Sequence, residues 1–484
     1  VCAGSAKHTP AMSNLTAVVL AAGQGTRMKS ALSKVLHPIA GRPLVYYSVR
    51  AALDAGASRV ILVVSPAARA AIEEYVIGEF GDQVVRTAVQ EVARGTGDAA
   101  RVGLEAVDEE RVLILCGDTP LLVGSQLGAL VSALDADPKL ELSFMSCIVE
   151  DPIGYGRILR SQNGAVREIR EQRDLENDEQ RAIREINAGM YAARTASLRA
   201  TLGQIRPSNA QGEYYLTDTV AIAARSGGAH AVLGDPSALV GVNDRAQLSR
   251  AEDVLYARIA ERHGKLGVTV RGSARIEDGV VIEPDAVIES AVFLRGKTRI
   301  ARGAQIDAGC VVTDSSIGEN AVVKPYSVIV SSQVGAEAQI GPFAHLRPGS
   351  QIDEQAHVGN FVETKQTRLR RGAKANHLAY LGDGDVGEKA NVGAGTIFCN
   401  YDGFQKHRTV IGAGAFIGSD SQLVAPVTIG ENAYVGTGTT VTQDVPSEAL
   451  ALSRVRQENK PGYASRLRSR LLAAAQQVKA ARSK

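Results

Sequence analysis

Residues 411–441 read IGAGAFIGSDSQLVAPVTIGENAYVGTGTTV, and one aliphatic residue returns at every sixth position. These positions are Ile411, Ile417, Leu423, Ile429, Val435 and Val441. A period of six fits neither the roughly 3.6-residue repeat of an α-helix nor the alternation of a strand. It fits a hexapeptide solenoid, in which short strands turn corners and each coil stacks on the one before it.

The same six-residue step extends the solenoid back to Ile276. It is carried by Ile276, Ile282, Ile288, Leu294, Ile300, Ile306 and Val312, and again by Val334, Ile340, Leu346, Ile352 and Val358. Glycine follows the aliphatic residue at Gly318, Gly335, Gly341, Gly359, Gly387, Gly393, Gly412, Gly418, Gly430 and Gly436. A corner with an unusual φ, or a close backbone approach, explains glycine there. We therefore predict a parallel β-solenoid from residue 276 to residue 441.

The six-residue repeat is interrupted twice late in the solenoid, between Thr364 and Val386 and between Phe398 and Ile411. Insertions in a repeat form surface loops, and such loops often carry function. We expect a loop in each segment. His377 lies inside the first, and the second begins with Cys399 and ends in basic residues.

Composition sets limits on the 484-residue chain, which is long enough for two or three domains. A formal net charge of +2 argues against nucleic acid as a main partner. No apolar run reaches the roughly 18 residues of a membrane span. Residues 1–11 precede Met12 and are expected to lie outside the fold. The cysteines Cys2, Cys116, Cys147, Cys310 and Cys399 are far apart and form no CxxC pair, which indicates reduced thiols and no zinc site.

The N-terminal part begins with an apolar strand, Thr16–Ala22, that runs directly into a glycine turn at residues 23–28. Backbone N–H groups of such a turn can cradle phosphate. Strands at Val60–Val64 and Val112–Cys116 alternate with helical stretches such as Leu44–Ala55 and Ala99–Val107. This alternation predicts an open, mainly parallel α/β sheet that binds its ligand at the carboxyl ends of the strands.

The glycine turn is part of a longer motif, in which residues 20–28 read LAAGQGTRM, Lys34 follows, and residues 38–43 read PIAGRP. This set resembles the signature of sugar-nucleotide pyrophosphorylases. The solenoid resembles the left-handed parallel β-helix of hexapeptide acyltransferases. Joined in this order over residues 14 to about 462, the two resemble the family of bacterial bifunctional N-acetylglucosamine-1-phosphate uridylyltransferase/glucosamine-1-phosphate N-acetyltransferases.

The resemblance implies an α/β plus all-β fold in four segments. Residues 14–243 would form a Rossmann-like nucleotidyltransferase domain, 244–264 a linker helix, 265–462 a left-handed β-helix acetyltransferase domain, and 463–484 a basic tail. Leu248, Leu255 and Ile259 have mostly helical spacing in the linker. Three hexads make one triangular coil in that family, so the solenoid would have about nine coils and a length on the order of 40 Å.

The resemblance also implies a uridylyl-transfer site. It assigns the nucleotide to Leu20, Ala21, Ala22 and Gly23, the phosphates to Arg27 and Lys34, the uracil to Gln90, Gly95 and Thr96, and the amino sugar to Gly156, Glu171 and Asn187. Asp118 and Asn243 would bind Mg²⁺, since a hard cation suits one carboxylate, one amide and phosphate oxygens. Cys116 stands where the family often has tyrosine.

For the acetyl-transfer site the resemblance makes His377 the general base, with Glu363 as its polar support. A histidine suits this role because its side chain exchanges protons near neutral pH. The sugar phosphate is assigned to Arg347, Lys365, Tyr380 and Asn391, and acetyl-CoA to Ala394, Ser419, Thr437 and Arg454. Asn400 and Tyr401 are assigned to acetyl-CoA or to the adjoining sugar phosphate. Thr437 replaces an expected small residue.

The implied activity is synthesis of UDP-N-acetylglucosamine for peptidoglycan and lipopolysaccharide. Glucosamine-1-phosphate would be acetylated from acetyl-CoA, and N-acetylglucosamine-1-phosphate would then receive a uridylyl group from UTP with release of pyrophosphate. Mg²⁺ is the expected cofactor, and UTP and acetyl-CoA are substrates. A cytoplasmic homotrimer without nucleic-acid or membrane partners is expected.

Two alternatives compete for the solenoid. Zinc carbonic anhydrases of the same architecture use three histidines, and His345, His357, His377 and His407 are available here. The close histidine pair of that family is absent, however. The other alternative is a pyrophosphorylase whose solenoid serves only assembly.

Overall fold

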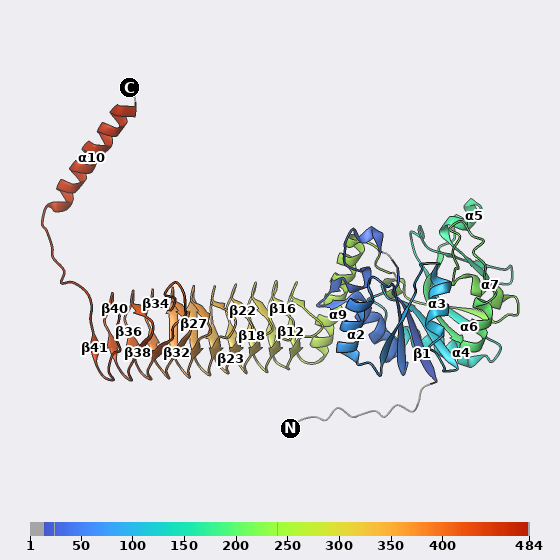
Figure 1. The fold of residues 1–484 in the computed structure, drawn as a ribbon, viewed down its shortest axis with the longest axis horizontal. Coiled ribbons are helices and arrows are strands. Elements are labelled where there is room, and N and C mark those ends of the chain that lie inside the picture. The colour runs from blue at the N-terminus through green and yellow to red at the C-terminus, as the bar shows by residue number, and fades with distance from the viewer. Residues whose placement is uncertain (1–13, 24, 240, 483–484) are drawn as a thin grey trace. The chain divides into compact units, whose positions relative to one another are not determined.

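The computed structural model describes residues 14–23, 25–239 and 241–482, so the predicted extension at residues 1–11 lies outside the described residues. The chain forms two compact units (Figure 1). The first contains the chain up to Lys265 together with Ala274–Val280. The second contains Leu266–Ser273 and the chain from Val281 onward.

A twisted sheet with the order β11-β7-β10-β6-β1-β4-β5 forms the centre of the first unit. Its four neighbouring strands β6, β1, β4 and β5 are parallel, as predicted, while β10 is antiparallel to both β6 and β7. The strands are β1 Leu15–Leu20, β4 Arg59–Val64, β5 Val85–Val89, β6 Arg111–Cys116, β7 Leu142–Ile148, β10 Glu185–Arg194 and β11 Ala229–Leu233, with the hairpin β8 Arg157–Arg160 and β9 Val166–Arg170 beside β10.

Helices cover both faces of this sheet, because β1 is apolar on both sides. Ala17 and Val19 belong to one core with α1, α2 and α4, whereas Val18 belongs to a second core with α3, α6 and α7. The helices are α1 Leu44–Asp54, α2 Arg69–Phe80, α3 Thr96–Leu104, α4 Gly124–Ala136, α6 Thr195–Leu202 and α7 Asp218–Ala224. A continuous apolar run is typical of a central strand buried in this way.

Helix α9 extends from Arg245 to Lys265 and buries Ala251, Leu255 and Ile259. The short strand β13 (Arg275–Ile276) packs against it within the first unit. Arg262 also donates a hydrogen bond of 3.0 Å to Asp278. The first unit thus includes the whole helix and one returning segment of the chain.

The second unit is a parallel β-helix, as the six-residue period predicts, and it has three faces, as the resemblance implies. The first face runs from β12 (Thr269–Val270) to β41 (Leu450–Ala451), the second runs from β16 (Phe293–Arg295) to β40 (Thr440–Val441), and the third runs from β14 (Val281–Ile282) to β38 (Val427–Ile429). The repeated aliphatic residues point inward, and Ile288, Val358 and Ile417 are fully buried.

The expected loop between Thr364 and Val386 is not present. Strands β28 (Glu363–Lys365), β29 (Arg368–Leu369), β30 (Lys374–His377), β31 (Tyr380–Gly382) and β32 (Gly384–Val386) continue the coils without interruption. The period was obscured because Thr364 and Ala375 take inward positions, both fully buried, and because the steps Thr364→Leu369 and Leu381→Val386 have five residues. Both short steps fall at the corner between the second and third faces.

The second predicted loop does exist, at the same corner. It follows β34 (Ile397–Cys399), folds back through a bridge between Tyr401 and Lys406, and ends at β35 (Thr409–Ile411). Beyond the coils, α10 extends from Tyr463 to Arg482. In the described part of the chain no helix is long and apolar enough to cross a membrane.

The coils stack so closely that replacing a glycine between them should destabilise the β-helix. A Cβ atom built on Gly359 would lie 2.0 Å from the carbonyl oxygen of Asn376 in the next coil. We expect Gly359→Ala to lower the free energy of unfolding of the β-helix by about 1–3 kcal/mol, because an overpacked position forces the backbone to move. Urea titration followed by circular dichroism measures this.

Gly438→Asn is the matched control. Gly438 has a φ of 72° with nothing near its Cβ position, and Asp420 adopts a similar φ at the same point of the preceding coil. Asparagine tolerates this conformation, so the stability of the control should change by less than about 0.5 kcal/mol. Equal stabilities for the two variants would contradict the close packing at Gly359.

Candidate functional site

The carboxyl ends of β1 and β6 open into a pocket of about 290 Å³. Its lining comprises Leu20, Ala21, Gly23, Gly25, Thr26, Arg27, Lys34, Val35, Asp118 and Asn243. Most of the predicted nucleotide, phosphate and metal residues therefore meet in one place, although Ala22, which is buried, is not part of the lining. Strand ends of an open α/β sheet are where ligands bind in such folds.

A network of charges crosses the floor of this pocket. The Lys34 ammonium is ion-paired with Asp118 and donates a 3.0 Å hydrogen bond to Oδ1 of Asn243. Arg27 donates to the same Asn243 oxygen at 2.9 Å. Asp118 and Asn243 are thus close enough to share one cation, here the lysine ammonium. Two oxygen ligands with room for further oxygens fit Mg²⁺.

Gln90 directly follows β5 and is 5% exposed. Its amide nitrogen donates to Oδ2 of Asp98 at 2.9 Å and to the Gly95 carbonyl at 3.3 Å. Gly95 has a φ of 109°, and the Thr96 hydroxyl accepts a hydrogen bond from the Leu216 N–H. The three predicted uracil residues therefore lie together. Asp98, which the sequence analysis did not select, connects to them.

The predicted amino-sugar residues also lie together. The Asn187 N–H donates to the Gly156 carbonyl at 2.9 Å, and a Cβ on Gly156 would lie 3.2 Å from Glu171. A bulge between Asn187 and Tyr191 interrupts β10, and the Tyr191 hydroxyl accepts a hydrogen bond from the Asn187 amide. Burial raises the pKa of Glu171 even though Thr217 donates a hydrogen bond to it.

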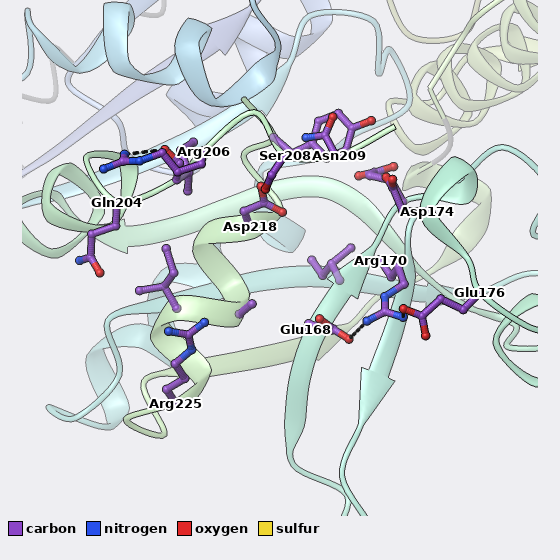
Figure 2. A pocket seen from close by; sticks show the side chains of 16 residues that line it. Glu168, Arg170, Asp174, Glu176, Gln204, Arg206, Ser208, Asn209, Asp218 and Arg225 are labelled. Atoms are coloured by element: carbon purple, nitrogen blue, oxygen red, sulfur yellow. Dashed lines mark hydrogen bonds and ion pairs between the residues drawn. The ribbon is translucent and has the colours of Figure 1, made fainter. Parts of the chain in front are cut away.

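A larger cavity of about 640 Å³, also lined by Glu171, lies between β9, α7 and the segment after α6 (Figure 2). Figure 2 shows Asp218 between Arg206 and Asp174, with Arg225 just past the end of α7. Burial, together with the nearby Asp174 and Glu168, raises the pKa of Asp218 to about 6. Nothing in the sequence pattern indicated this cavity, because its residues come from three separate segments.

In the second unit, the predicted catalytic and acetyl-CoA residues form one column at the corner between the first and second faces. The Gly395 N–H donates to the His377 carbonyl, that of Asp420 to Ala394, and that of Gly438 to Ser419. Arg454 closes the column with a 2.5 Å hydrogen bond to the Thr437 carbonyl. Successive coils therefore place His377, Ala394, Ser419 and Thr437 directly above one another.

The predicted sugar-phosphate residues Lys365 and Tyr380 lie on neighbouring strands of the second face, and Arg347 directly follows β25 (His345–Leu346) of the same face. Lys406, from the loop after β34, lies beside Lys365 and lowers the pKa of its ammonium. Clustered cations of this kind suit a phosphate. Lys406 was not selected from the sequence, although the basic ending of its loop was a signal.

Glu363 does not support His377 as expected. It accepts a 2.8 Å hydrogen bond from Arg347, and no side chain among the described residues is bonded to the His377 imidazole. The reason is register, since Glu363 projects from the second face whereas His377 lies at the preceding corner. Glu363 and Arg347 form an ion pair instead.

Of the three further predicted residues, Asn391 lies apart from this cluster in a single chain. Asn400 and Tyr401 adjoin it, because Nδ2 of Asn400 and the Tyr380 hydroxyl would both lie 2.5 Å from a Cβ built on Gly382, and Tyr401 pairs with Lys406. Asn391 is on the first face, where it pairs with Lys374. Asn400 donates a hydrogen bond to Asp383, and the Tyr401 hydroxyl donates to the Gly403 carbonyl within the loop. One chain therefore brings Asn400 and Tyr401 to the cluster but leaves Asn391 on another face.

The histidines of the carbonic anhydrase alternative do not converge. His345 lies on the second face, His357 on the first, and His407 hydrogen-bonds Asp402 in the loop. Throughout residues 14–23, 25–239 and 241–482, no group of three or more histidine, cysteine, aspartate or glutamate side chains could hold a metal ion.

Comparison with known proteins covers both units. Residues 17–180 match the MobA-like NTP transferase domain, and residues 408–443 match the bacterial transferase hexapeptide with six repeats, whose β-helix is left-handed. The chain is 61% identical to the bifunctional protein GlmU of Sorangium cellulosum (strain So ce56), over 95% of this chain and 98% of that protein.

The GlmU proteins of Anaeromyxobacter sp. (strain Fw109-5) and Trichlorobacter lovleyi are 48% and 45% identical to this chain. The matches cover 95% and 92% of this chain, and 94% and 97% of the two relatives, respectively. The similarity thus extends through both units and α9 rather than one domain alone.

The Cys116 thiol beside the metal-site pair gives a pH-dependent prediction. Burial, reinforced by the neighbouring Asp118 carboxylate, raises its pKa from 9.0 to about 12. Iodoacetamide reacts with the thiolate, so alkylation at pH 8 should be about a thousandfold slower than in the unfolded chain. The rate should then increase as the pH rises toward 12. Mass spectrometry of the Cys116 peptide measures it.

The unfolded protein in guanidinium chloride is the control, because its Cys116 has an ordinary thiol environment. Equal rates for Cys116 in the folded and unfolded protein at pH 8 would show that the thiol is neither buried nor influenced by Asp118.

Proposed function

The chain belongs to the bifunctional GlmU family, and we propose that its two sites catalyse successive steps in the synthesis of UDP-N-acetylglucosamine. It is a transferase with uridylyltransferase and acetyltransferase activities. The observation that carries the proposal is the convergence of both predicted residue sets. The predicted phosphate and metal residues meet at the strand-end pocket, and the predicted base and most of the sugar-phosphate residues occupy one corner and one face of the β-helix.

In uridylyl transfer, a phosphate oxygen of N-acetylglucosamine-1-phosphate attacks the α-phosphorus of UTP. A new P–O bond forms, the bond to the β-phosphate breaks, and pyrophosphate leaves. Such a reaction needs positioning and charge neutralisation rather than a covalent nucleophile. Arg27 and Lys34 supply positive charge at the pocket floor, while Gly23 lets backbone N–H groups approach phosphate oxygens.

Asp118 and Asn243 would hold Mg²⁺, which would neutralise phosphate charge when bound. The fit rests on two oxygens that already converge on one ammonium group, that of Lys34. Lys34 must then exchange Asp118 for a phosphate oxygen as the nucleotide binds. Arg27, already bonded to Asn243, would keep that amide oxygen oriented.

In acetyl transfer, the amine of glucosamine-1-phosphate attacks the thioester carbonyl of acetyl-CoA. A C–N bond forms, the C–S bond breaks, and the amine proton passes to the His377 imidazole while coenzyme A leaves. Arg347, Lys365 and Lys406 would bind the sugar phosphate. The column Ala394, Ser419 and Thr437 would support acetyl-CoA below His377, with Arg454 near its phosphates.

We propose that the acetyl-transfer site is completed by a second copy of the chain in a homotrimer. Asn391 lies on a different face from Arg347 and Lys365, so one chain cannot direct all of them at one sugar. An exposed ladder of Tyr326, Phe343 and Phe361, with ring centroids 5.4 and 5.3 Å apart, follows the corner that carries His377. Exposed apolar ladders of this kind mark interaction surfaces.

The substrates are small molecules, and we propose that the protein acts in the cytoplasm, where UTP and acetyl-CoA are made. Reduced thiols fit that compartment, since Cys116, Cys147, Cys310 and Cys399 are free. The product would supply the synthesis of peptidoglycan and lipopolysaccharide. A solenoid that served only assembly would not need a basic cluster beside an exposed histidine.

Asp118→Asn should reduce uridylyl transfer by more than the roughly 10–100-fold that outer-shell substitutions cost at metal sites. Removing the anionic ligand leaves Mg²⁺ and the phosphates poorly placed. Pyrophosphate release at saturating UTP, titrated with Mg²⁺, measures the loss. Asp108→Asn, which changes an exposed carboxylate of the same unit, is the control. An unchanged Mg²⁺ dependence in Asp118→Asn would remove Asp118 from the metal site.

His377→Ala should reduce acetyl transfer by about 10²–10⁴-fold, because a positioned base contributes that much. Coenzyme A release, measured with a thiol reagent, follows the reaction, and uridylyl transfer in the same sample should be unchanged. His357→Ala is the matched control, since His357 lies one coil away on the first face. Full acetyl transfer by His377→Ala would leave the second unit with an assembly role.

A further inference from the structure

The side-chain amide of Gln90 is held in one orientation by two partners. Its nitrogen donates to Oδ2 of Asp98 at 2.9 Å and to the carbonyl oxygen of Gly95 at 3.3 Å. A carbonyl oxygen can only accept, and an ionised carboxylate can only accept. The NH₂ group of Gln90 must therefore face Asp98 and Gly95.

Asp98 is suited to hold this orientation. It is 6% exposed, and Arg101 donates a 2.6 Å hydrogen bond to its other oxygen, Oδ1. Burial acts to raise the pKa of the Asp98 carboxyl, but hydrogen bonds from Gln90 and Arg101 outweigh it and bring the pKa below its ordinary value. Asp98 therefore stays ionised and accepts from both neighbours.

The opposite atom of the amide, Oε1 of Gln90, is the one that a ligand can reach. In the described part of the chain no donor contacts it. It is also not among the buried side-chain atoms that lack a partner, so the small exposed fraction of Gln90 includes this oxygen. Gln90 thus presents a hydrogen-bond acceptor at the ligand-binding edge of the sheet.

Hydrogen bonds and close packing hold the backbone turn that follows Gln90 in place. The Gly97 N–H donates to the Tyr214 carbonyl at 2.8 Å, and a Cβ on Gly95 would lie 2.5 Å from the same oxygen. The Leu216 N–H donates to the Thr96 hydroxyl at 3.1 Å. Backbone on both sides of the Gln90–Asp98 pair is therefore fixed.

We propose that Asp98 is a positioning residue that determines the choice of nucleobase, by turning the acceptor oxygen of Gln90 toward the base. Uracil presents a donor at N3–H, whereas cytosine presents an acceptor at N3. The fixed Oε1 attracts the first and repels the second. Thymine shares the edge of uracil and is not distinguished by this contact. The inference rests on the proposed uridylyl-transfer function, in which Gln90 contacts the uracil.

Asp98→Asn tests the proposal because Arg101 decides how the introduced amide lies. The guanidinium needs an acceptor, so the oxygen of the introduced amide should face Arg101 and its NH₂ group should face Gln90. Gln90 should then turn its own oxygen toward that NH₂ group, giving up the longer 3.3 Å hydrogen bond to the Gly95 carbonyl, and present its own NH₂ group to the base. We expect the ratio of kcat/KM for UTP to that for CTP to fall at least tenfold, mainly through a higher KM for UTP.

Two companion variants make the test specific. Arg101→Met retains the carboxylate of Asp98, so it should keep the wild-type ratio. In the double variant, which combines Asp98→Asn with Arg101→Met, the oxygen of the introduced amide is released to accept from Gln90, and the ratio should recover toward wild type. A merely structural role for Asp98 would not be rescued by a second substitution. The ratio is also independent of the folded fraction of enzyme, so partial instability does not obscure it.

Gln90→Leu separates this inference from the function on which it rests. If Gln90→Leu lowers the UTP/CTP ratio but Asp98→Asn does not, Asp98 has no role in base choice and the proposal is overturned. If neither variant changes the ratio, Gln90 does not contact the base, and the assignment of the uracil site fails with it. A lower UTP/CTP ratio in Asp98→Asn, with recovery in the double variant, supports the proposal.

Discussion

Backbone hydrogen bonding between successive coils is the constraint on which the second unit depends. Each coil donates to the next at the same positions, so equivalent residues lie directly above one another. Glycines allow this approach, since a Cβ on Gly418 would lie 2.4 Å from the Thr437 nitrogen. A functional column can therefore be built from residues as distant in sequence as His377 and Thr437, with no loop to position them.

The first unit solves the same problem through parallel strands, whose carboxyl ends lie at one edge. Leu20 is the last residue of β1, and Asp118 lies just after the end of the adjacent strand, β6. Asn243 joins them from a distant segment because the Val242 N–H donates to the Asp118 carbonyl at 2.9 Å. Rigid backbone positions both sites, which is how preorganised charge becomes useful for transfer reactions.

The sequence predicted both folds, because hexad spacing and strand–turn motifs are local signals, whereas the proposed members of both sites came from the family resemblance. It predicted a loop around His377 wrongly, since a period of six cannot reveal that one corner also accepts five-residue steps. The pairing of Glu363 with Arg347 was hidden for a similar reason, because the face of a side chain depends on its exact place in the coil. The cavity beside Glu171 has no sequence signal, since separate segments form it.

Sequence motifs identify a residue, whereas chemistry depends on which atom of that residue faces the ligand. Asn187 binds the Tyr191 hydroxyl with its NH₂ group and the Gly189 N–H with its oxygen, so both ends of its amide are already assigned. Asn243 directs its oxygen to Arg27 and Lys34 because its NH₂ group faces the Gly241 carbonyl. Partners outside the motif thus determine whether the oxygen or the NH₂ group of an amide faces the ligand. Selectivity between substrates of similar shape depends on that orientation, because a buried site rejects a mismatched hydrogen-bonding group far better than a small change in size.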